Sequence, residues 1–290
     1  MTPIISSLLV LSLGVLLASA TAGLAVILLG VAARPVAAST SGTTTIGDGG
    51  APLHRAPSLG LAVAFLTLVA ALVLRTILVG HAPWSNLHEF SLAFAAALIG
   101  THLVLGRAHP LGGLAPFTAL LAAGLIGFAL GLDDRVDPLV PALQQPLLLT
   151  VHVGTAVLAY AVSGVAFVAA AAEIGQSRAG DRIPLLPSAA VARAVGHRAV
   201  LIAFPILTIA IALGSVWANL AWRSYWNNDP KELAAAATWL VFGAYLHVAG
   251  RRDRWERLAP WLIVLGFAGV LFTYIGAGLF FIGEHSYAAP

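Results

Sequence analysis

The stretch of sequence that decides the fold runs from residue 147 to residue 172 and reads LLLTVHVGTAVLAYAVSGVAFVAAAA. It contains no Asp, Glu, Lys or Arg, and as a helix it is long enough to cross a hydrocarbon core of roughly 30 Å. An open strand would leave unpaired backbone groups in lipid, and the run lacks the alternating polarity of a barrel strand. The stretch therefore predicts a transmembrane helix.

Apolar runs of the same character recur along the whole chain, at residues 4–33, 59–80, 90–106, 114–132, 147–172, 199–218, 233–249 and 260–282. The chain of 290 residues is 59% hydrophobic and only 9% charged, whereas soluble domains carry roughly 25% charged residues. The sequence therefore predicts an all-α, polytopic membrane protein with about eight transmembrane helices. These helices would form a single integral membrane domain over residues 1–290, embedded in the lipid bilayer.

The N-terminal run contains Ala18-Ser19-Ala20, a triplet of the kind that signal peptidase cleaves. No positively charged segment precedes the run, and it stays apolar beyond this triplet. We therefore expect a first transmembrane helix here rather than a cleaved signal peptide.

The basic residues fall mostly on one side of the membrane. If both termini are extracytoplasmic, the cytoplasmic loops hold Arg34, Arg55, Arg107, Arg178, Arg182, Arg193, Arg198, Arg251, Arg252, Arg254 and Arg257. The other side holds only Arg135, Arg223 and Lys231. This distribution follows the positive-inside rule and predicts that both termini are extracytoplasmic. It also argues against a nucleic-acid partner, because the net charge of +3 is not gathered on a soluble domain.

The first cytoplasmic loop has the composition of a flexible linker. Within residues 34–58 lies the segment STSGTTTIGDGG at 39–50, which is rich in Ser, Thr and Gly. We expect a flexible cytoplasmic loop over 34–58.

A segment rich in tryptophan follows the sixth apolar run and reads WANLAWRSYWNNDPKE at residues 217–232. Its aromatic side chains, led by Trp217, Trp222 and Trp226, suit a platform for a flat ligand, with Arg223 and Lys231 available for acidic groups. The alternative is an interfacial aromatic belt, which is common in membrane proteins. We expect an extracytoplasmic loop over residues 214–232.

Two histidines are predicted at the same depth as this loop. His152 lies near the extracytoplasmic start of the fifth run, and His285 follows the end of the eighth. Two imidazoles beside aromatic rings suit the axial ligation of haem iron. His247 lies about 22 Å further inward at 1.5 Å per residue from Glu232, too deep for the same ligand. The chain has no Cys, which excludes disulfides, thiolate metal sites and thiol redox chemistry.

Arg75 is a cation within the second apolar run, near its extracytoplasmic end. It either snorkels to the headgroups or binds an acidic group of the ligand.

At this point the sequence resembles a known family. The matching motifs are Trp217-Ala218-Asn219, Ala221-Trp222, Tyr225-Trp226 and Asp229-Pro230-Lys231-Glu232, then Thr238-Trp239-Leu240-Val241-Phe242 and Tyr245-Leu246-His247. Others are Gly80-His81, Pro83, Ser85-Asn86-Leu87, His152-Val153 and His285-Ser286-Tyr287. Together they resemble the tryptophan-rich haem-handling proteins of the CcsA/ResC type, and the Asp-Pro-Lys-Glu ending distinguishes that branch from CcmC and CcmF.

This resemblance implies a function in cytochrome c maturation. The protein would bind haem b as a transported substrate and present it on the outer membrane face for attachment to the Cys-X-X-Cys-His of an apocytochrome c. It would be a subunit of a holocytochrome c synthase in a bacterial-type plasma membrane or a thylakoid equivalent. Its partners would be a CcsB/ResB-type membrane protein, the apocytochrome and thioredoxin-like thiol-reducing proteins.

The resemblance also implies roles for individual residues. His152 and His285 would be the external haem ligands, and His247 would pair with a histidine of the CcsB/ResB-type partner at an inner site. The haem contacts would include Asp229 and the tryptophans and cations of the 214–232 loop. Asn228 and Ala234 depart from the family pattern, because tryptophan is usual at both positions.

Two other functions remain open on the residues alone. One is a transporter of a small solute or ion, in which the histidines serve as relay or coordination groups. The other is a structural subunit that stabilises a haem-carrying partner.

Overall fold

The structure is a computed structural model that describes residues 2–32, 51–109, 111–135, 143, 146–251 and 257–285. Within these ranges the chain is helical and contains no strand. The long helices are α1 (Pro3–Ala32), α2 (Ala51–Val79), α3 (Leu87–Leu105), α4 (Ala115–Leu130), α5 (Pro146–Ala179), α6 (Ala189–Trp222), α7 (Pro230–Val248) and α8 (Ala259–Leu271). Three short elements complete the list: a 3₁₀ turn η2 (Gly112–Leu114), a π-helical segment η4 (Phe272–Gly276) and α9 (Ala277–Phe280).

The predicted fold class is confirmed, since each apolar run of the sequence coincides with a helix. By length and composition, seven of the described helices could cross a membrane, with α8, η4 and α9 counted as one span. The eighth helix, α7, has 19 residues like α3, but Lys231, Glu232 and His247 lower its hydropathy. It packs against α6 and α8 within the same bundle.

Helices α5 and α6 run further than their apolar cores predicted, with 34 residues each. At 1.5 Å per residue each is about 51 Å long, which exceeds the hydrocarbon thickness. Polar contacts support the additional turns. Arg193 Nε lies 2.7 Å from Glu173 Oε1, and the Gln176 side chain exchanges two hydrogen bonds with the backbone of Ile183 in the connecting turn.

Helix α2 also begins earlier than predicted, at Ala51. The end of the expected flexible loop over 34–58 is therefore helical, while residues 33–50 lie outside the described residues.

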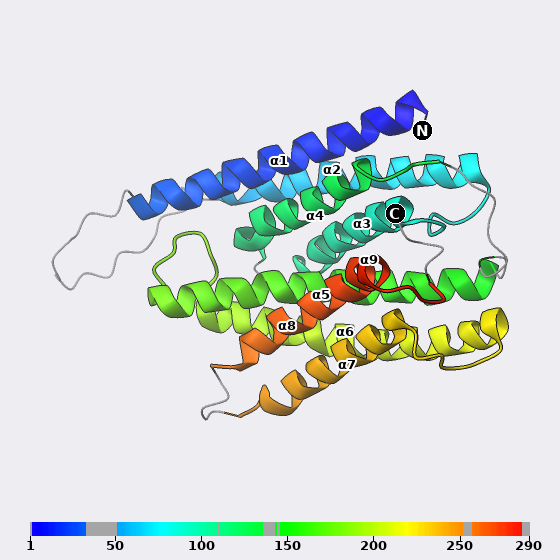
Figure 1. Ribbon diagram of the computed structural model, residues 1–290. Helices are drawn as coiled ribbons and strands as arrows, with labels where there is room; N and C mark the ends of the chain where they lie inside the picture. Colours follow the sequence, from blue (N-terminus) through cyan, green and yellow to red (C-terminus); the bar gives the residue numbers. More distant parts are fainter. Residues whose placement is uncertain are drawn as a thin grey trace, which may run out of the picture.

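Helix α5 lies at the centre of the bundle. It packs against α3, α6 and α8, whereas α1 packs against α2 and α4 on one side and α7 against α6 and α8 on the other (Figure 1). Its buried face is rich in small residues, including Ala159, Ala166 and Ala169, all of which are fully buried. Small side chains let helix backbones approach closely, which is how membrane helices gain packing energy without a hydrophobic driving force.

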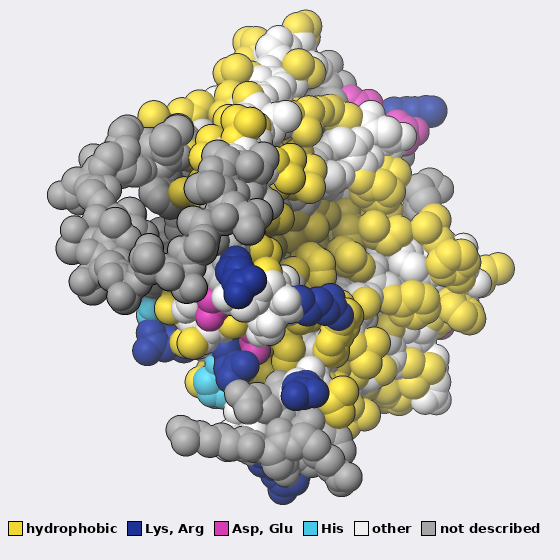
Figure 2. All heavy atoms as spheres, turned by 90° about the vertical axis from the view of Figure 1, so that its left-hand side faces the viewer, with side chains coloured by type: hydrophobic (Ala, Val, Ile, Leu, Met, Phe, Trp, Pro, Cys, Tyr) yellow, Lys and Arg dark blue, Asp and Glu magenta, His cyan; other side chains and the backbone are white. Residues whose placement is uncertain are grey.

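The outer surface of the bundle is apolar. Leu66, Ile77 and Leu240 are 66%, 73% and 62% exposed, which suits contact with lipid acyl chains. Basic side chains gather at one end of the bundle, which we call the basic end: Arg107, Arg178, Arg182, Arg193, Arg198, Arg251 and Arg257. Figure 2 looks onto this end and shows dark blue side chains there, beside a flank covered by hydrophobic ones. We call the opposite end, where α3, α5 and α7 begin, the cavity end.

Candidate functional site

A half-enclosed cavity of about 190 Å³ opens between the helices at the cavity end. It is walled by the start of α3, the start of α5, the end of α6, the start of α7 and the π-helical segment η4. Its lining includes Trp84, Phe90, Leu149, His152, Tyr160, Trp217, Trp226, Lys231, Tyr274 and His285. Most of these groups are aromatic or apolar, so the cavity suits a large, flat, mainly hydrophobic ligand. A π-helical segment within a span is frequently found at functional sites.

The tryptophan-rich segment is mainly helical, which corrects the loop predicted over residues 214–232. Helix α6 continues to Trp222 and ends because Arg223 adopts a left-handed backbone conformation with φ of 63°. The irregular connection is therefore confined to residues 223–229. Trp217 and Trp222 lie on the last turns of α6, where the helix fixes the direction of both indole rings.

The start of α7 explains the Asp-Pro-Lys-Glu sequence physically. Asp229 is the N-cap, and its Oδ1 accepts a hydrogen bond of 2.9 Å from the backbone N–H of Lys231. The carboxylate of Glu232 accepts a 3.1 Å bond from the backbone N–H of Asp229, which completes a capping box. Pro230 occupies the first helical position, where its missing N–H has no cost.

Asn228, one of the two positions that depart from the resembled pattern, has a structural role. Its backbone is left-handed with φ of 56°, a conformation that Asn tolerates better than most residues. Its Oδ1 accepts a 3.0 Å hydrogen bond from Trp226 Nε1. The Asn thus stabilises both the turn and the neighbouring indole.

Asp229 also holds His285. Nδ1 of His285 lies 2.8 Å from Asp229 Oδ1, and the two residues are 56 positions apart in the chain. Burial by itself raises the pKa of the Asp229 carboxyl, but the hydrogen bond and charge of His285, together with backbone N–H groups, outweigh it and hold that pKa at about 2. An ionised carboxylate only accepts hydrogen bonds, so Nδ1 of His285 carries the proton. In the neutral ring the lone pair is then on Nε2, the nitrogen that coordinates metals.

His152 is held in the same way from another helix. Its Nδ1 lies 2.9 Å from the backbone carbonyl oxygen of Ala210 on α6. A carbonyl oxygen can only accept, so this Nδ1 is protonated and the lone pair is on Nε2. Gly214 permits the contact, because a Cβ at that position would lie 2.6 Å from His152 Cε1.

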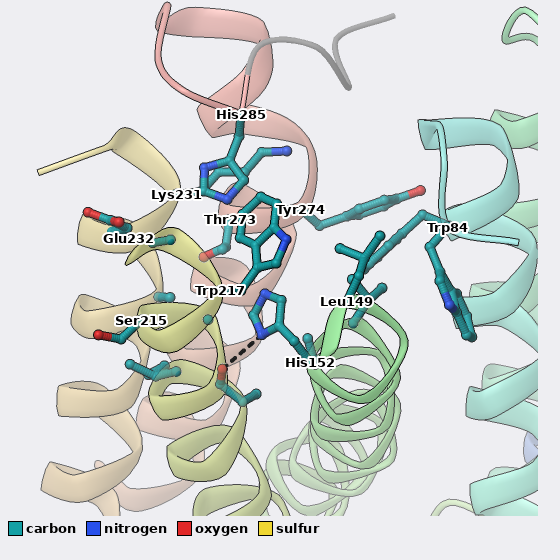
Figure 3. A pocket seen from close by; sticks show the side chains of 18 of the residues that line it. Trp84, Leu149, His152, Ser215, Trp217, Lys231, Glu232, Thr273, Tyr274 and His285 are labelled. Carbon is teal, nitrogen blue, oxygen red and sulfur yellow. Dashed lines mark hydrogen bonds between the residues drawn. The ribbon is translucent and has the colours of Figure 1, made fainter. Parts of the chain in front are cut away.

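The indole of Trp217 lies between the two imidazoles (Figure 3). Its centroid is 6.1 Å from that of His152, with the rings within 13° of parallel, and 5.7 Å from that of His285. Trp222 supports the arrangement by edge contacts with both Trp217 and His285, at 4.7 and 4.8 Å. The two histidines and two tryptophans thus form one ring cluster at the cavity end.

Of the other residues predicted for the site, some line the cavity and others lie outside it. Lys231 and Trp226 line the cavity, whereas Arg223 caps α6 and is exposed outside it. His247 lies in the last turn of α7, near the basic end, and its side chain is exposed. The cavity also contains Trp84 and Tyr274, which sequence reasoning did not select. Trp84 lies in the loop between two apolar runs and Tyr274 lies inside the last run, so the sequence offered no signal for them beyond their aromatic character.

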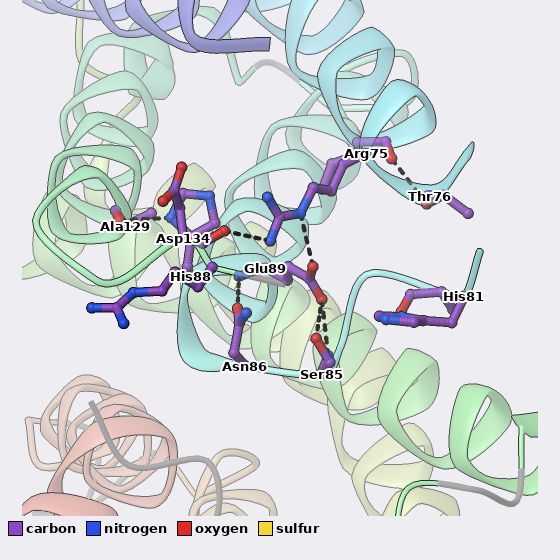
Figure 4. A network of polar contacts seen from close by, with 12 residues as sticks. Arg75, Thr76, His81, Ser85, Asn86, His88, Glu89, Ala129 and Asp134 are labelled. Carbon is purple, nitrogen blue, oxygen red and sulfur yellow. Dashed lines mark hydrogen bonds and ion pairs between the residues drawn. The ribbon is translucent and has the colours of Figure 1, made fainter. Parts of the chain in front are cut away.

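Arg75 belongs to a separate buried cluster (Figure 4). Its Nε lies 2.9 Å from Glu89 Oε1, and its Nη2 donates a 2.8 Å hydrogen bond to the carbonyl of Asp134. The other Glu89 oxygen accepts from the backbone N–H and hydroxyl of Ser85, at 3.0 and 2.7 Å. Arg75 and Glu89 are 2% and 1% exposed. The side chain of Arg75 is buried in this cluster and is not among the residues that line the cavity. A cation within a span is instead neutralised by a buried carboxylate.

The fold and the ring cluster define a class: a polytopic membrane protein with a cavity lined by two imidazoles, each held through Nδ1 by a hydrogen-bond acceptor. Comparison with known proteins identifies the family within this class. The family model for the cytochrome C assembly protein matches residues 84–285. This range begins at Trp84 and ends at His285, so it includes the residues of the cavity.

Similar proteins agree with this match. The chain is 35% identical over 260 residues to the cytochrome c biogenesis protein CcsA of Synechococcus sp. (strain CC9902), covering 78% of this chain and 84% of the relative. It is 36% identical over 242 residues to the CcsA protein of Chlamydomonas reinhardtii, covering 80% and 68%. The chain therefore belongs to the cytochrome c assembly protein family, of the CcsA type, and functions in cytochrome c maturation.

A solved structure shares the fold. The cytochrome c heme lyase CcmF superposes with a TM-score of 0.66 at 22% identity, over 94% of this chain. The match covers 47% of CcmF, so this chain spans about half the length of that protein.

Proposed function

We propose that this chain binds haem b, as a transported substrate, in the cavity and presents it for covalent attachment to the Cys-X-X-Cys-His of apocytochrome c. His152 and His285 are the axial ligands of the iron. The observation that carries the proposal is the common geometry of the two rings: both line one cavity, and each is held through Nδ1 by a group that only accepts hydrogen bonds. A metal-bound histidine typically donates its other N–H in this way, which fixes its tautomer and orientation.

The donor set favours haem over a bare metal ion. Among the residues that the structure describes, no three or more His, Cys, Asp or Glu side chains are grouped so as to hold an ion. Two imidazoles are sufficient when a macrocycle supplies the other ligands to iron. The surrounding aromatic rings suit a porphyrin face, and the cation of Lys231 favours a ligand with acidic groups.

Trp217 now fills the volume between the two imidazoles. A porphyrin coordinated by both His152 and His285 needs that volume, so we expect the Trp217 indole to move when haem binds. The displaced ring remains next to Trp222 and can still pack on the edge or face of the porphyrin.

The remaining roles are proposed from the sequence resemblance and the expected orientation. With the cavity end extracytoplasmic, haem is held where apocytochrome c and thioredoxin-like thiol-reducing proteins act. His247, exposed near the basic end about 22 Å further inward, would pair with a histidine of a CcsB/ResB-type partner. The two chains would form a holocytochrome c synthase in a bacterial-type plasma membrane or a thylakoid equivalent.

The proposal is tested by the visible absorption of the purified protein with its partner. The wild-type complex should show a haem Soret band, and His152→Ala or His285→Ala should lower haem per protein and cytochrome c yield. Added imidazole should restore part of both by filling the vacant axial position. His81→Ala is a matched control, because His81 lies in a loop at the cavity end but does not line the cavity. Unchanged haem content in both alanine variants would exclude these residues as ligands.

A further inference from the structure

Trp84 lines the wall of the cavity and carries a buried hydrogen-bond donor. It lies in the short connection between α2 and α3 and lines the cavity on the α3 side. Its Nε1 is shielded from solvent and has no hydrogen-bond partner among the described residues. The indole N–H of a buried tryptophan usually finds an acceptor, because leaving it unpaired carries a desolvation cost.

The backbone around Trp84 is held in place by its neighbours. The backbone N–H of Trp84 donates to the carbonyl of Ala82, at 2.9 Å. The next residue, Ser85, gives both its backbone N–H and its hydroxyl to Glu89, which is ion-paired with the buried Arg75. The loop that carries Trp84 is therefore anchored, through Ser85, to a buried ion pair.

The position of this donor relative to the histidines restricts what can bind it. Figure 3 shows Trp84 across the cavity from His285, His152 and Trp217. If the iron lies at the histidines, as in the proposed function, the edge of the porphyrin extends away from them. Haem carries methyl, vinyl and propionate groups at its edge, and only the propionate carboxylates are good hydrogen-bond acceptors.

We propose that the indole N–H of Trp84 donates a hydrogen bond to a propionate carboxylate of haem, and so selects the edge by which the porphyrin is held. This inference rests on the proposed function. The bond would place the carboxylate edge on the α3 wall and turn the vinyl groups, which react with the apocytochrome thiols, toward another side. Trp84 is thus a specificity-determining residue for the orientation of haem. Charge-assisted hydrogen bonds of this kind are roughly twice as strong as neutral ones.

The test compares two probes on the purified protein: haem and the dimethyl ester of haem, which lacks carboxylates. Trp84→Phe keeps an aromatic ring and removes the N–H. We expect it to weaken haem binding about tenfold and to weaken binding of the dimethyl ester distinctly less, because an ester carbonyl accepts only a neutral hydrogen bond. Trp226→Phe is the matched control, because Trp226 lines the same cavity but its N–H is already bonded to Asn228. That variant should not change the ratio of the two affinities.

A second measurement uses the wild-type protein alone, which should bind haem at least about tenfold more tightly than the dimethyl ester. Equal losses for both probes in Trp84→Phe would overturn the inference, because the ring would then act only by packing. No loss for either probe would also overturn it, since water would then satisfy the N–H. If the wild-type protein bound neither probe, the proposed function would fail, and this inference with it.

Discussion

Asp229→Asn separates two roles of one side chain. Asn caps a helix about as well as Asp, so α7 should keep its start. The negative charge that faces His285 disappears, however, and with it the charge-assisted bond to His285 that helps to hold the pKa of the Asp229 carboxyl below its ordinary value of 3.8. Losing the carboxylate behind a metal-bound histidine typically lowers metal affinity by roughly 10–100-fold. We therefore expect the variant to bind haem at least about tenfold more weakly while its helical content is unchanged.

The assay for this variant is haem titration followed at the Soret band, with circular dichroism to check the fold. Asp133→Asn is the control, since Asp133 is an exposed carboxylate at the cavity end, paired with Arg135 at 2.9 Å. Wild-type affinity in Asp229→Asn would refute the reasoning that the carboxylate orients His285. So would an equal loss in both variants, because the effect would then be a general one of surface charge.

The same pair gives a pH dependence with a definite sign. Folding lowers the pKa of Asp229 from 3.8 to about 2, so the contribution of its carboxylate is fully present above about pH 4. It is lost as the pH falls toward about 2. The stability of the haem-free protein should therefore fall between about pH 4 and pH 2 through this group, and the fall should be smaller in Asp229→Asn; acid unfolding followed by circular dichroism measures it.

Three further variants test other parts of the account. Gly214→Ala would place a Cβ 2.6 Å from His152 Cε1 and should lower haem occupancy severalfold. Gly154→Ala is the control, because the space around Gly154 is open, and it should leave haem occupancy unchanged. The Soret absorbance per protein measures the occupancy of both variants. Ser224→Cys introduces the only thiol of the chain, and a membrane-impermeant thiol reagent should label it from the extracytoplasmic side. Labelling from the cytoplasmic side alone would reverse the proposed orientation. His247→Ala, expressed with the partner, should reduce haem loading of the cavity although no cavity residue has changed. Normal haem per complex and normal cytochrome c yield would show that His247 is a packing residue.

The sequence predicted the helices well but not their ends. An apolar run long enough to span lipid can satisfy its backbone only as a helix, so the position of each span follows from composition. The ends depend on contacts that composition does not reveal. Glu173 and Arg193 extend α5 and α6 by pairing across them, and the left-handed conformation of Arg223 ends α6 later than expected.

The candidate site was predicted in part. Depth along the helices indicated that His152 and His285 lie at one end, and the structure brings both into one cavity. The bond between Asp229 and His285 could not be predicted, since it joins residues 56 positions apart. The pairing of Arg75 with Glu89 depends on the packing of α2 against α3. Hydropathy alone could not distinguish it from a cation that faces a ligand.

The central claim, that two histidines of this chain coordinate one haem iron, is tested most directly by electron paramagnetic resonance of the ferric, haem-loaded protein. The account predicts a low-spin signal typical of two imidazole ligands, which changes to a high-spin signal in both His152→Ala and His285→Ala and returns when imidazole is added. A wild-type protein with high-spin haem, or a low-spin signal that persists in either variant without imidazole, would contradict it.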